Sequence, residues 1–76
     1  MKEYTIIIYQ AEEGGYWAKV PALPGCYSQG ETIDETMNNT REAIESHIAA
    51  LKEDGQDIPV EHGQVISSRI AVSVGK

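Results

Sequence analysis

The sequence is poor in cysteine and in long apolar runs, and each shortage excludes a class of protein. Cys26 is the only cysteine among 76 residues, so a disulfide within one chain is excluded. A lone thiol is typical of a reducing compartment, and we expect a cytoplasmic protein. The first ten residues show no apolar core followed by a small-residue cleavage site, and no apolar run approaches the ~20 residues that span a membrane. We therefore expect neither a signal peptide nor a membrane segment.

Basic residues are also scarce. Six Lys and Arg face twelve Asp and Glu, which gives a formal net charge of −6. A chain of this charge is repelled by phosphate backbones, so we expect no direct nucleic-acid binding. The same charge attracts a basic protein partner. Solubility of a small protein is the simpler explanation of the charge taken alone.

The sequence also lacks any recognisable set of catalytic or metal-binding residues. His47, His62 and Cys26 share no ligand spacing, and no basic neighbour lowers the pKa of the cysteine. The apolar segments 4–9 and 65–74, which would be central strands of a nuclease, contain no carboxylate. No glycine-rich phosphate loop is present. We predict no catalytic residue, no metal and no cofactor, and hence no enzyme.

The N-terminal half has the pattern of a three-stranded meander. Residues 1–11 alternate with apolar side chains on both faces, which predicts a central strand. Gly14 and Gly15 then permit a hairpin turn. Residues 16–21 predict a second strand, and residues 26–30 a short third one.

A helix and a further strand follow. Thr32 and Glu35 form a T-x-x-E capping box, and Gly55 with the following Pro59 predicts the helix end. The predicted buried stripe of the helix consists of Ile33, Met37, Thr40, Ile44, His47, Ile48 and Leu51. Residues 64–74 alternate again and predict a fourth strand. The expected fold is a single α+β domain over residues 1–76, in the order β-β-β-α-β, with one helix on one face of the sheet.

This order leaves apolar surface uncovered. One helix covers one face of a sheet, so the other face remains for a partner. The fourth strand is expected at an edge, where it offers an oligomer interface. That interface consists of Ile66, Ile70, Val72 and Val74. Pairing of two such strands and face-to-face packing both remain open as routes to a homodimer or a higher homo-oligomer.

An ordered set of small motifs carries a family resemblance. The set is Gly15-Tyr16-Trp17, Pro21, Leu23-Pro24-Gly25, Gly30, Thr32, Ala43, Asp54-Gly55 and Ile58-Pro59. In order and spacing it resembles the HicB antitoxin family, including its short stand-alone members, over nearly the whole chain. The resemblance implies a partial ribonuclease-H-like fold without catalytic carboxylates. It also implies neutralisation of HicA, a small basic RNA-cleaving toxin, by binding that blocks its active site. Many HicB proteins carry a C-terminal DNA-binding segment, which we do not expect in a sequence that ends at Lys76.

We predict that the toxin contacts the second strand, the loop after it and nearby acidic residues. These residues are Tyr16, Trp17, Lys19, Pro21, Leu23 and Pro24, with the acids Glu12, Glu13, Glu31 and Asp34. Tyr and Trp dominate interface energetics, although a core position is an equal alternative for either aromatic alone. The alternative function is an orphan homo-oligomeric module of HicB-like fold that has no toxin partner.

Overall fold

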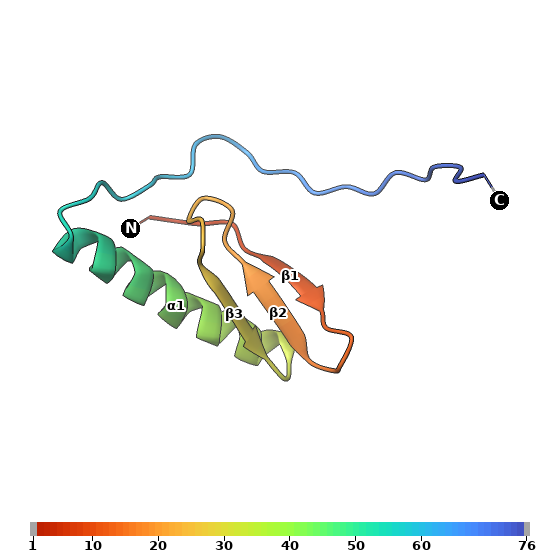
Figure 1. Ribbon diagram of the computed structural model, residues 1–76, viewed down its shortest axis with the longest axis horizontal. Coiled ribbons are helices and arrows are strands. Elements are labelled where there is room, and N and C mark those ends of the chain that lie inside the picture. Colours follow the sequence, from red (N-terminus) through yellow and green to blue (C-terminus); the bar gives the residue numbers. More distant parts are fainter. Residues whose placement is uncertain (1, 76) are drawn as a thin grey trace.

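The computed structural model describes residues 2–75 and contains a three-stranded antiparallel sheet with one helix (Figure 1). The elements are β1 (Ile7–Gln10), β2 (Tyr16–Lys19), β3 (Tyr27–Gly30) and α1 (Ile33–Glu53). The strand order is β1-β2-β3, and Ala18 of β2 lies opposite Ile8 of β1 and Ser28 of β3. The predicted α+β meander and helix are therefore confirmed. Met1 and Lys76, which belong to the predicted domain 1–76, lie outside the described residues.

The first strand differs from its prediction. Of the described residues 2–11 only Ile7–Gln10 are paired, and β1 lies at an edge of the sheet rather than at its centre. Residues Tyr4 and Ile6 instead pack on the core from the extended stretch before β1. The apolar pattern on both faces of this segment reflects its burial, but in the single chain it has a strand neighbour on one side only.

The hairpin between β1 and β2 forms where the glycines predict it. Gly14 and Gly15 have φ angles of 104° and 74°, which side-chain-bearing residues rarely adopt. The N–H of Ala11 donates to the carbonyl of Gly15 at 3.0 Å and closes the turn.

The helix begins and ends as its capping residues predict. The hydroxyl of Thr32 accepts a hydrogen bond from the N–H of Glu35 at 3.0 Å, and the Glu35 carboxylate accepts one from the N–H of Glu31 at 2.7 Å. At the other end Asp54 is the C-cap, and Gly55 follows with φ 68°. Both ends of the 21-residue helix thus satisfy their exposed backbone groups locally.

The helix meets the sheet through small residues. The predicted stripe is confirmed from Thr40 onward, where its members are buried or half-buried, but in the first turns Thr36 takes the buried position instead of Ile33 and Met37. Thr36 and Thr40 are fully buried, whereas Met37 is 46% exposed. Burial of the two threonines costs little because their hydroxyls donate to the carbonyls of Thr32 and Thr36. A Cβ on Gly30 would lie 2.7 Å from the backbone nitrogen of Thr36, so strand β3 and the helix are in close contact.

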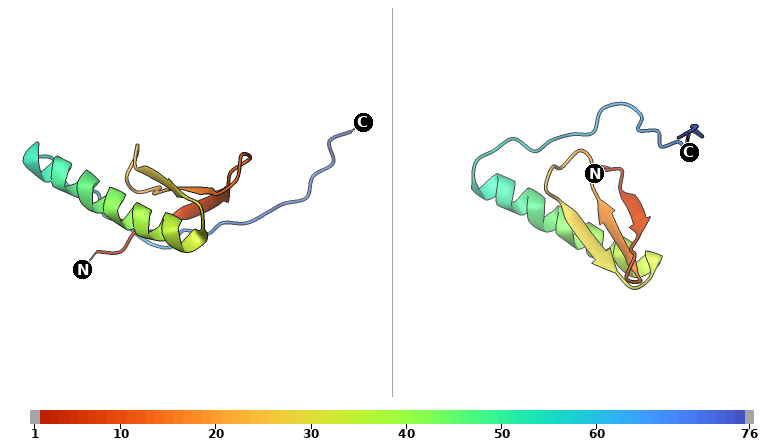
Figure 2. Two further views of the ribbon diagram at one scale, coloured as in Figure 1. Left: turned by 90° about the horizontal axis from the view of Figure 1, so that it is seen from below. Right: turned by 45° about the vertical axis from the view of Figure 1, so that its right-hand side comes forward.

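The core is small and lies between α1 and one face of the sheet (Figure 2, left). Its buried apolar side chains are Ala18, Val20, Leu23 and Cys26. Tyr4, Ile6, Ala43 and Ile44 pack around it and are partly buried. The opposite face of the sheet is left open, as expected for a sheet with one helix.

The predicted fourth strand is not part of the sheet in the described residues. Segment 56–61 returns to the start of β1, where the Tyr4 hydroxyl donates to the carbonyl of Pro59 at 2.6 Å. The Glu61 carboxylate accepts from the N–H of Thr5 at 2.6 Å and from its hydroxyl at 2.5 Å. Residues 64–75, the C-terminal arm, then run away from the domain without pairing (Figures 1 and 2). The predicted fourth strand is therefore not confirmed in the single chain, where this segment has strand-like alternation but no neighbouring strand along its path.

Candidate functional site

The open face of the sheet carries a cluster of aromatic side chains. Tyr9 lies opposite Trp17, and Lys19 lies opposite Tyr27, on neighbouring strands. The rings of Tyr9 and Trp17 stack with centroids 4.4 Å apart, and the Tyr27 ring lies 6.3 Å from that of Trp17. The ammonium of Lys19 lies 5.8 Å from the centroid of the Tyr9 ring. We call these four residues the aromatic face.

The aromatic face is both exposed and ordered. Tyr9 and Trp17 are each 37% exposed, and Tyr27 is 60% exposed. Stacking and cross-strand packing hold the rings in place, so a partner would meet side chains that are already arranged. Rings of this kind supply much contact area at a low cost in conformational entropy. The arrangement is suited to binding another protein.

Tyr16 and Trp17 do not share this surface. Successive residues of a strand point to opposite faces, so Tyr16 lies on the helix side with the buried Ala18. It borders a hollow that Glu35, Asn39 and Trp17 also line. Of the predicted strand residues, Trp17 and Lys19 share the open face, and Tyr16 lies on the opposite face of the strand.

The loop after β2 is a tight hydrogen-bonded turn next to the aromatic face. The N–H of Leu23 donates to the carbonyl of Val20, and the N–H of Cys26 to the carbonyl of Leu23, both at 3.0 Å. Leu23 is fully buried and anchors the loop to the core, so it is a core residue rather than an exposed contact residue. Pro21 and Pro24 are exposed. Both border a hollow of about 440 Å³ that also reaches Lys19 and Tyr27.

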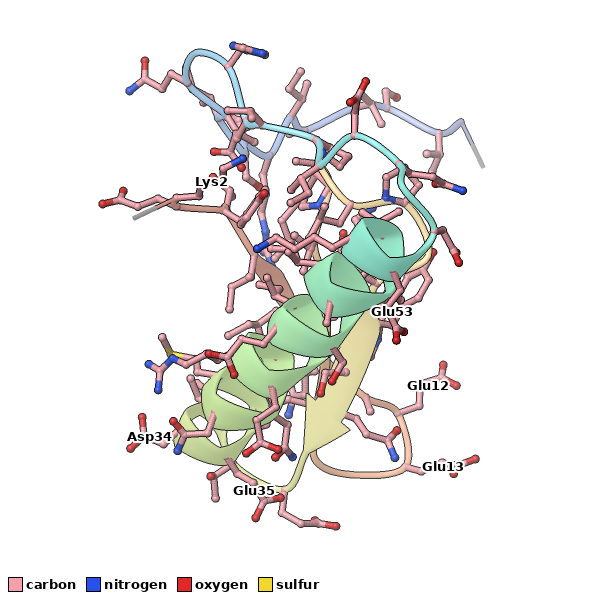
Figure 3. All side chains as sticks on the ribbon, turned by 90° about the vertical axis from the view of Figure 1, so that its left-hand side faces the viewer. Lys2, Glu12, Glu13, Asp34, Glu35 and Glu53 are labelled. Atoms are coloured by element: carbon pink, nitrogen blue, oxygen red, sulfur yellow. The ribbon has the colours of Figure 1, made fainter. Side chains whose placement is uncertain are left out.

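The predicted acidic residues gather at the hairpin end of the domain. Figure 3 shows the carboxylates of Glu12 and Glu13 from the β1–β2 turn, and those of Asp34 and Glu35 from the helix start, pointing outward at this end. The backbones of the two segments border one hollow, which Gly14 and Glu31 both line. We call this region the acidic end; it comprises Glu12, Glu13, Glu31, Asp34 and Glu35.

The chemistry of the remaining candidate groups is limited. Cys26 is 4% exposed, and burial raises the pKa of its thiol, which disfavours the thiolate that a nucleophile or metal ligand requires. Within residues 2–75, no three His, Cys, Asp or Glu side chains are grouped in a way that could hold a metal ion. Over the same residues, no helix is long and apolar enough to cross a membrane.

Sequence reasoning missed two members of the aromatic face and a groove on the helix side. Tyr9 and Tyr27 were recognisable from strand alternation, but their partnership with Trp17 requires the strand register. The groove has a volume of about 540 Å³ and lies between α1 and the stretch before β1. Its apolar lining includes Tyr4, Ile6, Met37, Ile44 and Ile48. No local sequence signal marks it, because its two walls lie far apart in the chain.

Comparison with known proteins gives a consistent family. The sequence profile described as "HicB_like antitoxin of bacterial toxin-antitoxin system" matches residues 4–71. A UPF0150 protein of Thermoplasma acidophilum is 43% identical over 65 residues, which cover 86% of this chain and 94% of the relative. A UPF0150 protein of Archaeoglobus fulgidus is 43% identical over 61 residues, which cover 78% of this chain and 88% of the relative.

Two solved structures are similar in fold. The N-terminal domain of the Burkholderia pseudomallei antitoxin HicB superposes with a TM-score of 0.69 at 38% identity, covering 80% of this chain and 70% of that one. A structure of the same organism's antitoxin HicB gives a TM-score of 0.74 at 30% identity, covering 99% of this chain and 76% of that one.

Proposed function

Because the chain belongs to the family of HicB-like antitoxins of bacterial toxin–antitoxin systems, we propose that it binds and blocks a small basic toxin of the HicA kind. The toxin's activity in this proposal is RNA cleavage. The chain acts by covering the toxin's active site rather than by any chemistry of its own.

The observation that carries this proposal is the aromatic face, which lies exposed on a sheet whose other face is covered. Trp17, stacked on Tyr9 and flanked by Tyr27, offers rigid apolar contact area of the kind that anchors interfaces. Pro21 and Pro24 extend this surface along the neighbouring loop. These residues form the proposed centre of the contact.

The acidic end supplies the electrostatic part of the proposal. Glu12, Glu13, Asp34 and Glu35 lie at one end of a chain whose net charge is −6, so a basic toxin is attracted toward that end before contact. An RNA-cleaving protein has to attract phosphate and therefore presents positive charge around its active site. The acidic end thus competes with RNA for the same surface of the toxin.

The first experiment mixes the purified chain with any small basic protein encoded beside it. We expect a stable mixed complex in size-exclusion chromatography with light scattering, together with loss of the partner's RNA cleavage. A neighbouring protein that does not bind this chain and does not cleave RNA would refute the toxin partnership.

A charge-reversal pair tests the role of the acidic end. Glu12→Lys/Glu13→Lys should slow association with the toxin and flatten its dependence on salt. The matched control is Glu42→Lys/Glu53→Lys, which changes the net charge equally on exposed helix positions. Equal association rates for the two variants in stopped-flow measurements would contradict the electrostatic part.

The second candidate function is a self-associating module without a toxin. The observation in its favour is the C-terminal arm, whose aliphatic side chains are largely exposed. We propose that the chain forms a homodimer or a higher oligomer through this arm, whether or not it also binds a toxin. A homo-oligomer that ignores every basic neighbour would favour this second function.

The remaining expectations stay predictions. They are a single domain, a cytoplasmic location, the absence of direct nucleic-acid binding and the absence of enzymatic activity. The partial ribonuclease-H-like architecture is also a proposal, because it needs a fourth strand beside the three that are present.

A further inference from the structure

The C-terminal arm leaves four aliphatic side chains of one strand face in solvent. Ile66, Ile70, Val72 and Val74 are 77%, 84%, 72% and 85% exposed. The arm stretches the molecule to 52 Å and its radius of gyration to 15.1 Å, against about 11 Å for a compact domain of this length. Apolar side chains so placed bury almost no surface in the single chain, and exposed apolar patches of this kind mark interaction sites.

The size of the exposed surface indicates a second copy of the chain. The chain exposes 6318 Å², whereas a compact protein of 8.3 kDa exposes about 4,600 Å². The excess is about 1,700 Å² per chain, and a standard interface buries about 800 Å² per partner. Two copies that each bury this excess would share an interface of the size found in obligate homodimers.

The edge strand β1 has the sequence of a central strand. Ile7 and Ile8 are both half-buried although they point to opposite faces, and β1 pairs with β2 alone among the described strands. Its outer edge therefore offers unpaired N–H and carbonyl groups between apolar side chains. Such an edge is a template for a further strand.

The groove on the helix side lies next to this edge. Ile6 contributes one wall, and Met37, Ile44 and Ile48 of α1 contribute the other. A strand added to the outer edge of β1 would place one of its two faces over this groove, because alternate side chains of the added strand point toward α1. The C-terminal arm has four aliphatic side chains on one strand face, and these side chains could fill the groove.

The chain's own arm does not fill the groove. The hydrogen bonds from Tyr4 to Pro59 and from Thr5 to Glu61 fix the chain at the start of β1. The chain then turns at Gly63, which has φ 72°, and Val65 lies beside the β2–β3 loop. Figure 1 shows the arm continuing away from β1.

We propose that two copies of this chain exchange their C-terminal arms. The arm of one copy adds a fourth strand to the outer edge of β1 in the other copy. Its face with Ile66, Ile70, Val72 and Val74 enters the groove, and its other face, with Ser67 and Ser73, remains in solvent. This inference rests on the self-association proposed above and does not require a toxin.

Full-length variants test the exchange by molar mass in light scattering over a range of concentrations. Ile70→Asp/Val72→Asp removes the apolar face of the arm, and Met37→Glu places a charge in the groove. All three side chains are exposed in the single chain, so these substitutions do not disturb its core. Ser67→Asp/Ser73→Asp adds the same charge as the first variant to the opposite face of the arm and is its matched control.

The exchange predicts twice the 8.3 kDa chain mass for the wild type and the serine control. It predicts the single-chain mass for the arm variant and for the groove variant, each alone. Mixing the arm variant with the groove variant should restore dimers, because one copy keeps an intact arm and the other an intact groove.

Two results would overturn the proposal. The first is a monomeric wild type. The second is a groove variant that stays dimeric while the arm variant is monomeric, with no rescue on mixing, since the arms would then pair with each other. Loss of toxin binding changes none of these masses, so the failure of the toxin proposal and the failure of this one are distinguishable.

Discussion

Replacement of Trp17 by alanine is the sharpest test of the aromatic face. A tryptophan side chain offers up to about 250 Å² of surface, so the 37% that is exposed amounts to about 90 Å². Burying that area against a toxin contributes about 2 kcal/mol at ~25 cal/mol per Å². Trp17→Ala should therefore raise the Kd of the complex about 30-fold. The stack with Tyr9 is already present in the free chain, so its loss affects the Kd only by leaving the Tyr9 ring less well arranged for binding.

The assay uses the fact that Trp17 is the only tryptophan of the chain. Its fluorescence emission should shift to shorter wavelength when the toxin buries the open face of the sheet. Trp17→Phe is the matched variant: it removes the chromophore but keeps a ring beside Tyr9, and it isolates any emission from the toxin. Its Kd should rise much less than that of the alanine variant.

The result that refutes the reasoning is specific. A complex with unchanged emission from Trp17 and a Kd within about twofold for Trp17→Ala would place the contact on another surface. Val60→Ala, at a residue that is 47% exposed and belongs to none of the three strands, gives the reference for a truncation outside the aromatic face.

The other predictions concern stability and reactivity. Gly30→Ala should lower Tm by at least about 4 °C, because the new Cβ would press strand β3 away from the helix backbone. Gln29→Ala, on the outward face of the same strand, should change Tm little. Equal Tm values for the two variants in calorimetry would contradict the close contact between β3 and α1. Hydrogen bonds from the hydroxyl and the N–H of Thr5 hold the pKa of Glu61 below its ordinary value of 4.5, so this contact stabilises the fold above that pH and is lost as the pH falls through the lowered pKa. The stability difference between wild type and Thr5→Val in urea titrations should therefore shrink toward zero in acid; a constant difference would be the opposing result. Cys26, which is 4% exposed, should react with a thiol reagent only as fast as the chain opens, and complete labelling within the mixing time would argue against its burial.

The helix start and the hairpin were predicted correctly because residues close together in the sequence determine them. The helix start depends on the bonds between Thr32 and Glu35, and the hairpin on the positive φ angles of Gly14 and Gly15. Both causes lie within a few residues, so the sequence contains them completely. The strand order of the meander follows equally from short connections.

The prediction errors concern burial and strand pairing, which depend on contacts between residues far apart in the chain. Thr36 was not predicted to be buried, because a polar residue becomes suitable for a core only once its hydroxyl bonds the preceding turn and Gly30 lets the strand approach. Tyr16 was grouped with Trp17 because both are aromatic, although strand alternation already separated them. Residues 64–74 alternate as a strand does, but alternation does not say which backbone a strand pairs with, and in the single chain they pair with none of the described strands.

The small core also bears on how long the chain survives in a cell. The four buried apolar side chains of residues 2–75 leave a modest margin of stability, and a ligand of the folded state adds to that margin by mass action. Chains without a partner will open more often, and proteases cleave the open form. The lifetime of the protein should therefore rise with the occupancy of its binding surfaces, so that excess unbound copies are removed first.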